Sequence, residues 1–326
     1  MVLPRMDRVR VTVALLLCAS AAIADDVITM RDGEKIEGLI IEADDDSVLV
    51  RWGAGRAVIS RRVPRKSIST IKLGEPNVDG LRELARRSES QGETLDAAQV
   101  WRIVCALRPE SADDHLRCAR ALRVSGRSDD AAAAIACASR LDADDARIRI
   151  EQGEIAFAKG DFRGALQHAQ DGLKRAGPTS VDGYWLLARA AEAAKDADAA
   201  IDACGKLLKA DTTHIGALER LVELLLARRA TLEAENVARS FVRAAPDVRA
   251  GRVALGVTLY RQSRWGEAVD AFRAATSLGG PGYERARVYL HVARARSADT
   301  DPERGLTEAD IAVARELDPD LGRKKP

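Results

Sequence analysis

The chain contains four histidines, His115, His168, His214 and His291, which are the side chains best suited to bind a metal or to act as a general base. No two of them have the short spacing of a motif such as His-Glu-x-x-His, which places two ligands on one face of a helix. From residue 25 onward the sequence also lacks a Gly-x-Ser-x-Gly elbow, a phosphate-binding loop and a dinucleotide fingerprint. We therefore predict no catalytic residues, no metal site and no bound cofactor, and we interpret the chain as non-enzymatic.

The five cysteines include no Cys-x-x-Cys pair, so they indicate neither a zinc framework nor a disulfide-dense scaffold. Cys105 and Cys118 are expected on neighbouring helices, and an oxidising compartment would permit a bridge between them. Both also fall at apolar positions of the helical pattern described below, where cysteine acts as a small hydrophobe. We interpret these two, together with Cys137 and Cys204, as free buried thiols.

The elements that carry these residues belong to a globular chain of 326 residues, of which 46% are hydrophobic and 31% charged. Lys and Arg number 51 against 50 Asp and Glu, so the net charge is +1. A protein dedicated to nucleic acid normally has a basic excess, and the composition argues against that class. Aromatic residues make up only 4%, which favours helices packed through small side chains.

The first 24 residues have the three parts of a secretory signal. Arg5, Arg8 and Arg10 precede an apolar run of about 13 residues, too short to span a membrane comfortably. The run ends in Ala22-Ile23-Ala24, which fits the small-x-small rule of signal peptidase. We predict cleavage before Asp25 and export to the periplasm or cell envelope. The alternatives are an uncleaved anchor, or lipidation at Cys18, because Leu15-Leu16-Leu17-Cys18 is similar to a lipobox.

Residues 25–73 alternate apolar and polar side chains with a period of two, which predicts a small β domain. Asp32-Gly33 is a strong hairpin signal, and Gly38 lies inside the second predicted strand as a bend or bulge. Strands are expected near residues 27–30, 36–43, 48–52, 57–59 and 67–71. Five short strands favour closure into a barrel, and the pattern resembles small SH3-like and Sm-like barrels.

Basic residues are concentrated in the second half of this domain. They are Arg56, Arg61, Arg62, Arg65 and Lys66. A basic face could bind an anionic envelope polymer, either a glycan or a lipid head group. The alternative is an ordinary solvated surface that complements the acidic first half of the domain.

After a linker at residues 74–77, a helical frame of 34 residues repeats to the C-terminal region. Its best example is residues 249–282, where Leu255, Gly256, Leu259, Ala268 and Phe272 occupy positions 7, 8, 11, 20 and 24. This pattern resembles the tetratricopeptide repeat family. The repeats lie near residues 78–111, 112–145, 146–180, 181–214, 215–248, 249–282 and 283–319. The seventh is irregular, because residues 299–302 lengthen its turn.

The resemblance implies a mostly α-helical fold, an α-solenoid of about seven helical hairpins over residues 78–326 preceded by the β domain. In this family the first helix of each repeat lines a concave groove, with positions 2, 5, 9, 12 and 13 pointing inward. The residues predicted to line a partner-binding groove are Leu116, Arg120, Phe157, Trp185, Arg189, Glu192, Glu223, Leu226, Val257, Tyr260 and Arg261. Phe157, Trp185 and Tyr260 are expected to anchor the partner; a frame shifted by one residue would instead bury them.

The sequence therefore predicts an exported, non-enzymatic scaffold that binds another protein or peptide and no nucleic acid. The alternative function is binding of an envelope polymer through the basic face of the barrel. In the tetratricopeptide repeat family, the carboxylate-clamp members have Lys at position 5 and Asn at position 9. No repeat here has this pair, so binding of a chaperone tail is not expected.

Overall fold

The computed structural model describes residues 26–43, 46–54, 57–72, 78–278, 281–319 and 321. The chain divides into two compact units, Met1–Lys159 and Gly160–Pro326, and we describe each by itself. The predicted signal at residues 1–24, the linker at residues 74–77 and Arg56 lie outside the described residues. The predictions about them therefore stay predictions.

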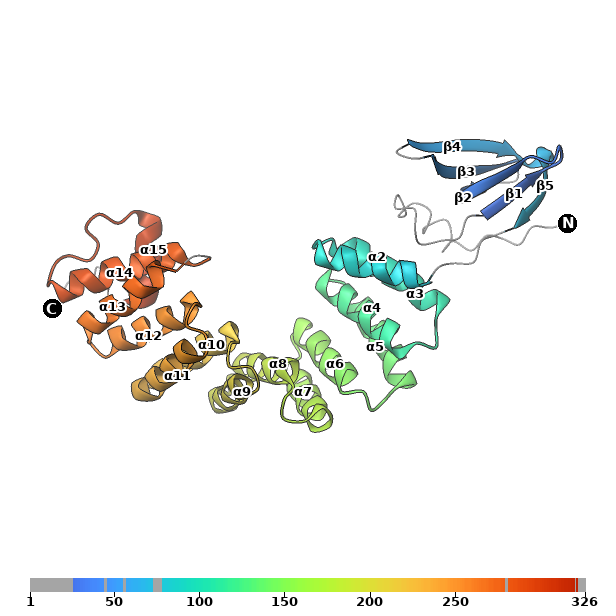
Figure 1. Cartoon of the computed structure of the whole chain (residues 1–326). Coiled ribbons are helices and arrows are strands. Elements are labelled where there is room, and N and C mark those ends of the chain that lie inside the picture. The colour runs from blue at the N-terminus through green and yellow to red at the C-terminus, as the bar shows by residue number, and fades with distance from the viewer. Residues whose placement is uncertain are drawn as a thin grey trace. The chain divides into compact units, whose positions relative to one another are not determined.

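The first unit begins with a five-stranded antiparallel sheet, formed by β1 (Asp26–Met30), β2 (Lys35–Ala43), β3 (Ser47–Ala54), β4 (Ala57–Pro64) and β5 (Ile68–Lys72). The strand order is β4-β3-β2-β1-β5, and a single 3-10 turn (Arg65–Ser67) separates β4 from β5 (Figure 1). The predicted strands are therefore present. Their closure into a barrel stays a prediction.

The hairpin signal and the alternation explain the register of the sheet. Gly33 adopts a left-handed φ of 92°, which suits the tight turn that Asp32-Gly33 predicts. β2 pairs with β1 as far as Gly38 and with β3 from the next residue onward, so the glycine marks the place where β2 changes its neighbour. Ile28 pairs with Ile36 and Val48 with Val63, and all four are buried in the core of the sheet.

Helices occupy the rest of the first unit. They are α2 (Val78–Ser90), α3 (Thr94–Leu107), α4 (Ala112–Val124), α5 (Ser128–Leu141) and α6 (Ala146–Ala158). One apolar core extends through these helices, with the indole of Trp101 fully buried in it. The first two repeats are helical hairpins as predicted (Figure 1).

The second unit contains nine helices among its described residues. They are α7 (Phe162–Ala176), α8 (Val181–Ala193), α9 (Ala197–Ala210), α10 (Ile215–Ala227), α11 (Thr231–Ala244), α12 (Arg249–Arg261), α13 (Trp265–Thr276), α14 (Tyr283–Ser297) and α15 (Glu308–Leu317). From α8 onward they form successive hairpins that share apolar cores.

Left-handed residues recur at the spacing of the 34-residue frame. In the first six repeats position 15 is Gly92, Gly126, Gly160, Lys195, Arg229 and Ser263, and each has a φ between 60° and 81°. The backbone N–H of position 16 commonly donates a hydrogen bond to the carbonyl oxygen of position 11. In the sixth repeat, Arg264 donates to Leu259 in this way at 3.0 Å. This bond satisfies a carbonyl that the end of the first helix would otherwise leave unpaired.

The seventh repeat differs from the predicted frame. Its left-handed residue is Asp299, two residues later than position 15 of a repeat that begins at Tyr283. α14 itself begins at Tyr283, the residue at which the sequence predicts the seventh repeat to begin. The lengthened turn is present, because α15 begins only at Glu308. The difference therefore lies in the turn and not in the beginning of the repeat.

Candidate functional site

The first-unit residues predicted to line a groove are largely engaged with the chain itself. The Glu151 carboxylate on α6 is 1% exposed and accepts hydrogen bonds from Arg123 at 2.6 Å and from Arg120 at 3.5 Å. Asp114 on α4, also buried, binds Arg82 of α2 at 2.5 and 2.9 Å. These carboxylates therefore join the first helices of neighbouring repeats. Arg120 has one of them, Glu151, as its partner, although its own side chain is 55% exposed.

Leu116 does not lie on an open groove. It is only 5% exposed and belongs to the apolar core that extends through the helices of the first unit. Phe157, near the end of α6, is half-buried. The prediction that Leu116 is available to a partner is wrong.

Trp185 of α8 is half-buried against the beginning of α10. Its ring centroid lies 4.9 Å from that of His214, and its indole edge covers Gly216, where an added Cβ would approach it to 2.9 Å. Arg189 places its guanidinium carbon 6.0 Å from the indole centroid. His214 is itself fixed, because its Nδ1 accepts the N–H of Ala217 at 3.0 Å and caps α10. Trp185 therefore packs two repeats together.

Glu192 is also paired within the chain. Its carboxylate binds Arg220 of α10 at 3.2 Å, and the same guanidinium nitrogen binds Glu223 at 3.2 Å. One arginine thus serves two carboxylates, which leaves the acidic side of α10 incompletely neutralised.

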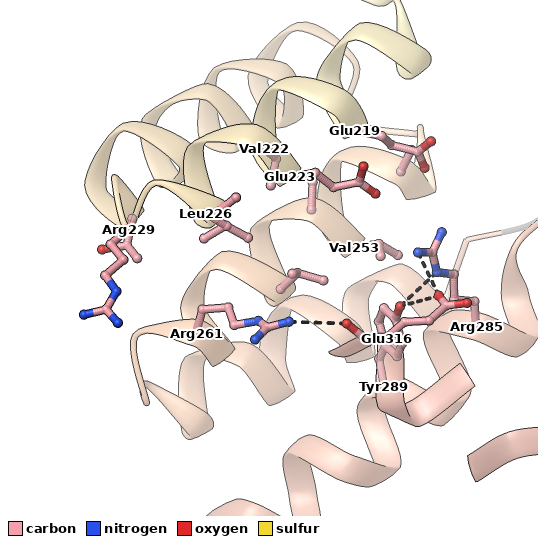
Figure 2. Close-up of a pocket in the computed structure, with 15 residues that line it drawn as sticks. Glu219, Val222, Glu223, Leu226, Arg229, Val253, Arg261, Arg285, Tyr289 and Glu316 are labelled. Atoms are coloured by element: carbon pink, nitrogen blue, oxygen red, sulfur yellow. Dashed lines mark hydrogen bonds and ion pairs between the residues drawn. The ribbon is translucent and has the colours of Figure 1, made fainter. Parts of the chain in front are cut away.

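A pocket of about 590 Å³ lies in the second unit between α10 and α12 (Figure 2). The residues that α10 contributes at inward positions are Glu219, Glu223, Leu226 and Ala227, and those from α12 are Ala250, Val253, Val257 and Arg261. They stand at positions 2, 5, 9, 12 or 13 of their repeats. Four predicted groove residues, Glu223, Leu226, Val257 and Arg261, are thus brought together in one hollow.

The far wall of the pocket is a hydrogen-bonded group from the seventh repeat. Arg285 pairs with Glu316 at 2.9 Å, and its Nε donates to the Tyr289 hydroxyl at 3.0 Å (Figure 2). That hydroxyl donates in turn to Glu316 at 3.0 Å. Burial raises the pKa of Tyr289 to about 12, so the hydroxyl keeps its proton at neutral pH.

Sequence reasoning did not place Arg285, Tyr289 or Glu316 in the groove. Counted back from Asp299 at position 15, Arg285 and Glu316 stand at positions 1 and 32, which the pattern does not point inward, whereas Tyr289 stands at position 5, an inward position. The signal that could have found it is Asp299, since aspartate tolerates the left-handed conformation better than most residues. Aligning the turns rather than the helix beginnings would have set the frame correctly.

Tyr260 is a second correction. It is 4% exposed, its ring meets that of Trp265 edge-on at 4.6 Å, and its hydroxyl donates to Asp318 at 2.7 Å. Arg296 binds the same carboxylate at 2.5 Å. The chain after α15 covers Tyr260, so this tyrosine belongs to the core of the last repeats and is no anchor on an open surface.

Among the described basic residues of the β domain, Arg61 and Arg62 do not share a face. Arg61 and Arg62 are neighbours in β4, so their side chains leave the strand on opposite sides. Arg61 pairs with Glu34 at 3.1 Å, and Arg62 donates to the Ser47 hydroxyl at 3.0 Å. Arg65 and Lys66 lie in the 3-10 turn that follows β4. The arrangement matches the alternative of a surface that complements its own charges.

The cysteines in the described part of the chain are free thiols. Cys105, Cys118 and Cys204 are buried, whereas Cys137 is only partly so. The adjacent Cys118 sulfur and burial together raise the pKa of the Cys105 thiol. Among the residues that the structure describes, no group of three or more His, Cys, Asp and Glu could hold a metal ion. No helix in those same ranges is long and apolar enough to cross a membrane.

Comparison with known proteins agrees with the repeat geometry. A family model described as "Tetratricopeptide repeat" matches residues 136–320, more than half of the chain. The chain belongs to the tetratricopeptide repeat family. No curated protein matches it.

Solved structures show the same tetratricopeptide repeat fold at low sequence identity. PilF of Pseudomonas aeruginosa is 16% identical, with a TM-score of 0.51 over 64% of this chain and 96% of that one. A repeat protein from Cytophaga hutchinsonii is 18% identical, with a TM-score of 0.54 over 73% and 95%. A chain of the APC/C hetero-tetramer Cut9–Hcn1 is 13% identical, with a TM-score of 0.50 over 66% of this tetratricopeptide repeat protein and 42% of that chain.

Proposed function

We propose that this chain is an exported, non-enzymatic scaffold that binds a peptide or protein segment in the groove of its fifth to seventh repeats. The observation that carries the proposal is the pocket between α10 and α12, whose lining residues stand at the inward positions of the first helices. Members of this family stack helical hairpins to create such surfaces.

The lining of the pocket suits a polypeptide. Val222, Val253 and Ala254 give it an apolar floor, while glutamates and arginines stand along its sides. Its volume falls in the range of about 300–1,000 Å³ that is common for ligand sites. Cut9–Hcn1, a structure of similar fold, is described as a hetero-tetramer. A protein or peptide partner is therefore the occupant that we propose.

The buried carboxylates support a structural role rather than a catalytic one. Asp114, Glu151 and Glu235 are each bonded to arginines that join helices. A carboxylate held in this way is not poised to transfer a proton to a substrate.

Export is the second part of the proposal, and it is supported by the sequence of residues 1–24. We expect the exported protein to begin at Asp25, and N-terminal sequencing of material from the envelope fraction will measure this. Residues 1–24 retained on exported protein would contradict cleavage and favour an anchored form, by the uncleaved segment or by a lipid on Cys18.

Capture of the partner tests the groove. The chain from residue 25 onward is used as bait on an envelope fraction, beside Val257→Asp, which places a charge on the wall of the pocket. The matched control is Leu232→Asp, because Leu232 is 70% exposed on α11 and lies outside the pocket. Circular dichroism verifies that all three baits are folded.

The captured protein is then purified, and its dissociation constant is measured for each bait. We expect Val257→Asp to weaken binding by about tenfold or more, as truncation of a central interface contact does. Leu232→Asp should leave the affinity within about twofold, as mutations outside an interface do. Equal binding by wild type and Val257→Asp would contradict the groove as the binding site.

A further inference from the structure

The groove of the fifth and sixth repeats has an apolar middle and two ends of opposite charge. On α10 and its turn, Glu219 and Glu223 stand at one end and Arg229 at the other (Figure 2). From Glu219 to Arg229 the chain advances by ten residues, about 15 Å at 1.5 Å per residue. Leu226 lies between them, over the apolar floor.

The acidic end keeps a surplus of negative charge. Arg285 stands there too, but its guanidinium is bound by Glu316 at 2.9 Å, so these two charges cancel locally. Among the described residues Glu219 has no ion pair, and Glu223 shares Arg220 with Glu192. Two exposed glutamates four residues apart on one helix repel each other, and a cation between them would relieve this.

The opposite end has a surplus of positive charge. Arg229 and Arg261 are both exposed, and neither has a carboxylate partner within the ranges that the structure describes. Arg261 begins near this end, at position 13 of its repeat, but its guanidinium is turned toward the far wall and donates to the Glu316 carbonyl oxygen at 3.4 Å (Figure 2). Arg229 therefore marks the basic end. The groove is therefore dipolar along its length.

We propose that this groove selects a segment with the complementary charge order: a lysine or arginine at the Glu219–Glu223 end, aliphatic residues in the middle, and a carboxylate at the Arg229 end. The inference rests on the proposed function, because it names the chemistry of the segment that the same groove binds. A span of about 15 Å corresponds to four or five residues of extended chain at about 3.3 Å each. Paired charges at both ends fix the register and direction of the segment more than they raise its affinity.

Three synthetic peptides test the charge order. They are Lys-Leu-Val-Leu-Glu, Lys-Leu-Val-Leu-Lys and Glu-Leu-Val-Leu-Glu, each acetylated and amidated so that the termini are neutral. Binding to the chain from residue 25 onward is followed by the NMR methyl signals of Val253, Val257 and Leu226, which also report the location. We expect the first peptide to bind roughly two- to tenfold more tightly than either of the others, the gain typical of exposed ion pairs. The difference should shrink at high salt.

Charge reversal of the protein gives the decisive comparison. The double variant Glu219→Lys/Glu223→Lys should prefer Glu-Leu-Val-Leu-Glu, because both ends of its groove would then be basic. The control double variant Glu233→Lys/Asp247→Lys makes the same change in net charge outside the pocket and should keep the wild-type order. Equal affinities for the three peptides, an unchanged preference after reversal, or no movement of the three methyl signals would each overturn the dipolar groove. The effect of Val257→Asp on the captured partner is measured separately, so failure of the peptides can be distinguished from failure of the proposed function.

Discussion

At the scale of single residues, the contact between positions 8 and 24 shows why the frame requires small side chains. Gly256 lies under the ring of Phe272, and an added Cβ would stand 2.5 Å from the aromatic Cε1 atom. Phe272 is fully buried and meets Tyr289 edge-on at 5.5 Å, so its ring has little room to move. A glycine that weakens helix propensity is therefore stabilising here through packing.

Two glycine-to-alanine substitutions, one at this contact and one away from it, should change the free energy of unfolding in opposite directions. Gly256→Ala should lower the free energy of unfolding by about 1–3 kcal/mol, because the methyl group overpacks the ring. Gly205→Ala, inside α9 with no atom within 4 Å of the added Cβ, should raise it by about 0.5–1 kcal/mol through helix propensity. Urea denaturation of both variants measures the difference. Stabilisation by Gly256→Ala would contradict the packing described for positions 8 and 24.

At the scale of elements, a buried charged side chain connects the two helices of the sixth repeat. Arg249 begins α12 and is 6% exposed. Its guanidinium donates to the carbonyl of Ala275 at 3.0 Å and also to those of Leu278 and Pro281. It thus satisfies carbonyl groups at the end of α13 and just beyond it, groups that a helix end leaves without internal partners.

Arg249→Met should therefore destabilise the second unit although it keeps a similar volume. We expect a loss of about 2–4 kcal/mol, since buried carbonyls lose hydrogen bonds to a charged donor. The control is Arg273→Met, because that arginine is 58% exposed and pairs only with Asp270, so its loss should cost less than about 1 kcal/mol. Thermal unfolding followed by circular dichroism compares the two. Equal melting temperatures for both variants would show that the carbonyl contacts contribute nothing.

Glu235 links α11 to the turn before α13 and gives the molecule a sensitivity to acid. Its carboxylate accepts hydrogen bonds from Arg239 and Arg264, each at 2.7 Å, and from Gln262 at 3.0 Å. Burial pushes the pKa of Glu235 up, but the bonds from Gln262 and Arg239 and the charge of Arg264 outweigh it and hold the pKa below its ordinary value of 4.5.

Because the folded pKa is depressed, the stabilisation from Glu235 is present above pH 4.5 and is lost as the pH falls through the folded pKa. The free energy of unfolding should therefore decrease as the pH falls below 4.5, and Glu235→Gln should reduce this decrease. Denaturation at several pH values between about 3 and 7 tests it, with Glu233→Gln on the exposed side of α11 as the control. An identical pH dependence for wild type and Glu235→Gln would refute the assignment.

At the scale of the whole molecule, the sheet and the helical repeats have separate apolar cores. The core of the sheet contains only residues of the β domain, from Ile28 to Val63, with Ile68 and Ile71 packed against it. Repeats contact mainly their sequence neighbours, and such arrays fold without a distant domain.

The helical region should accordingly fold alone. A fragment from Val78 to Pro326 is expected to show strong helical circular dichroism and to melt cooperatively, and the chain from residue 25 onward serves as the folded reference. An unfolded fragment beside a folded longer chain would contradict the boundary at residues 74–77.

The sequence alone determined the repeat architecture of this protein. Close approach of two helices demands a small residue at position 8, and a tight hairpin favours a residue such as Gly92 or Gly126 at position 15. Both requirements are local, so they appear as a fixed spacing along the chain. The same reasoning predicted the sheet, since the pairing of Ile28 with Ile36 follows from the alternation and the Asp32-Gly33 turn.

Only the tertiary structure decided which inward positions stay accessible. Leu116 and Tyr260 stand at inward positions, yet Leu116 belongs to the core of the first unit and Tyr260 is closed in by the segment around Asp318. Tyr289 lines the pocket because the turn of the seventh repeat comes two residues late. Exposure and the partners of a charged group depend on atoms that are distant in sequence, and a 34-residue pattern records only what each repeat needs to pack against its neighbours.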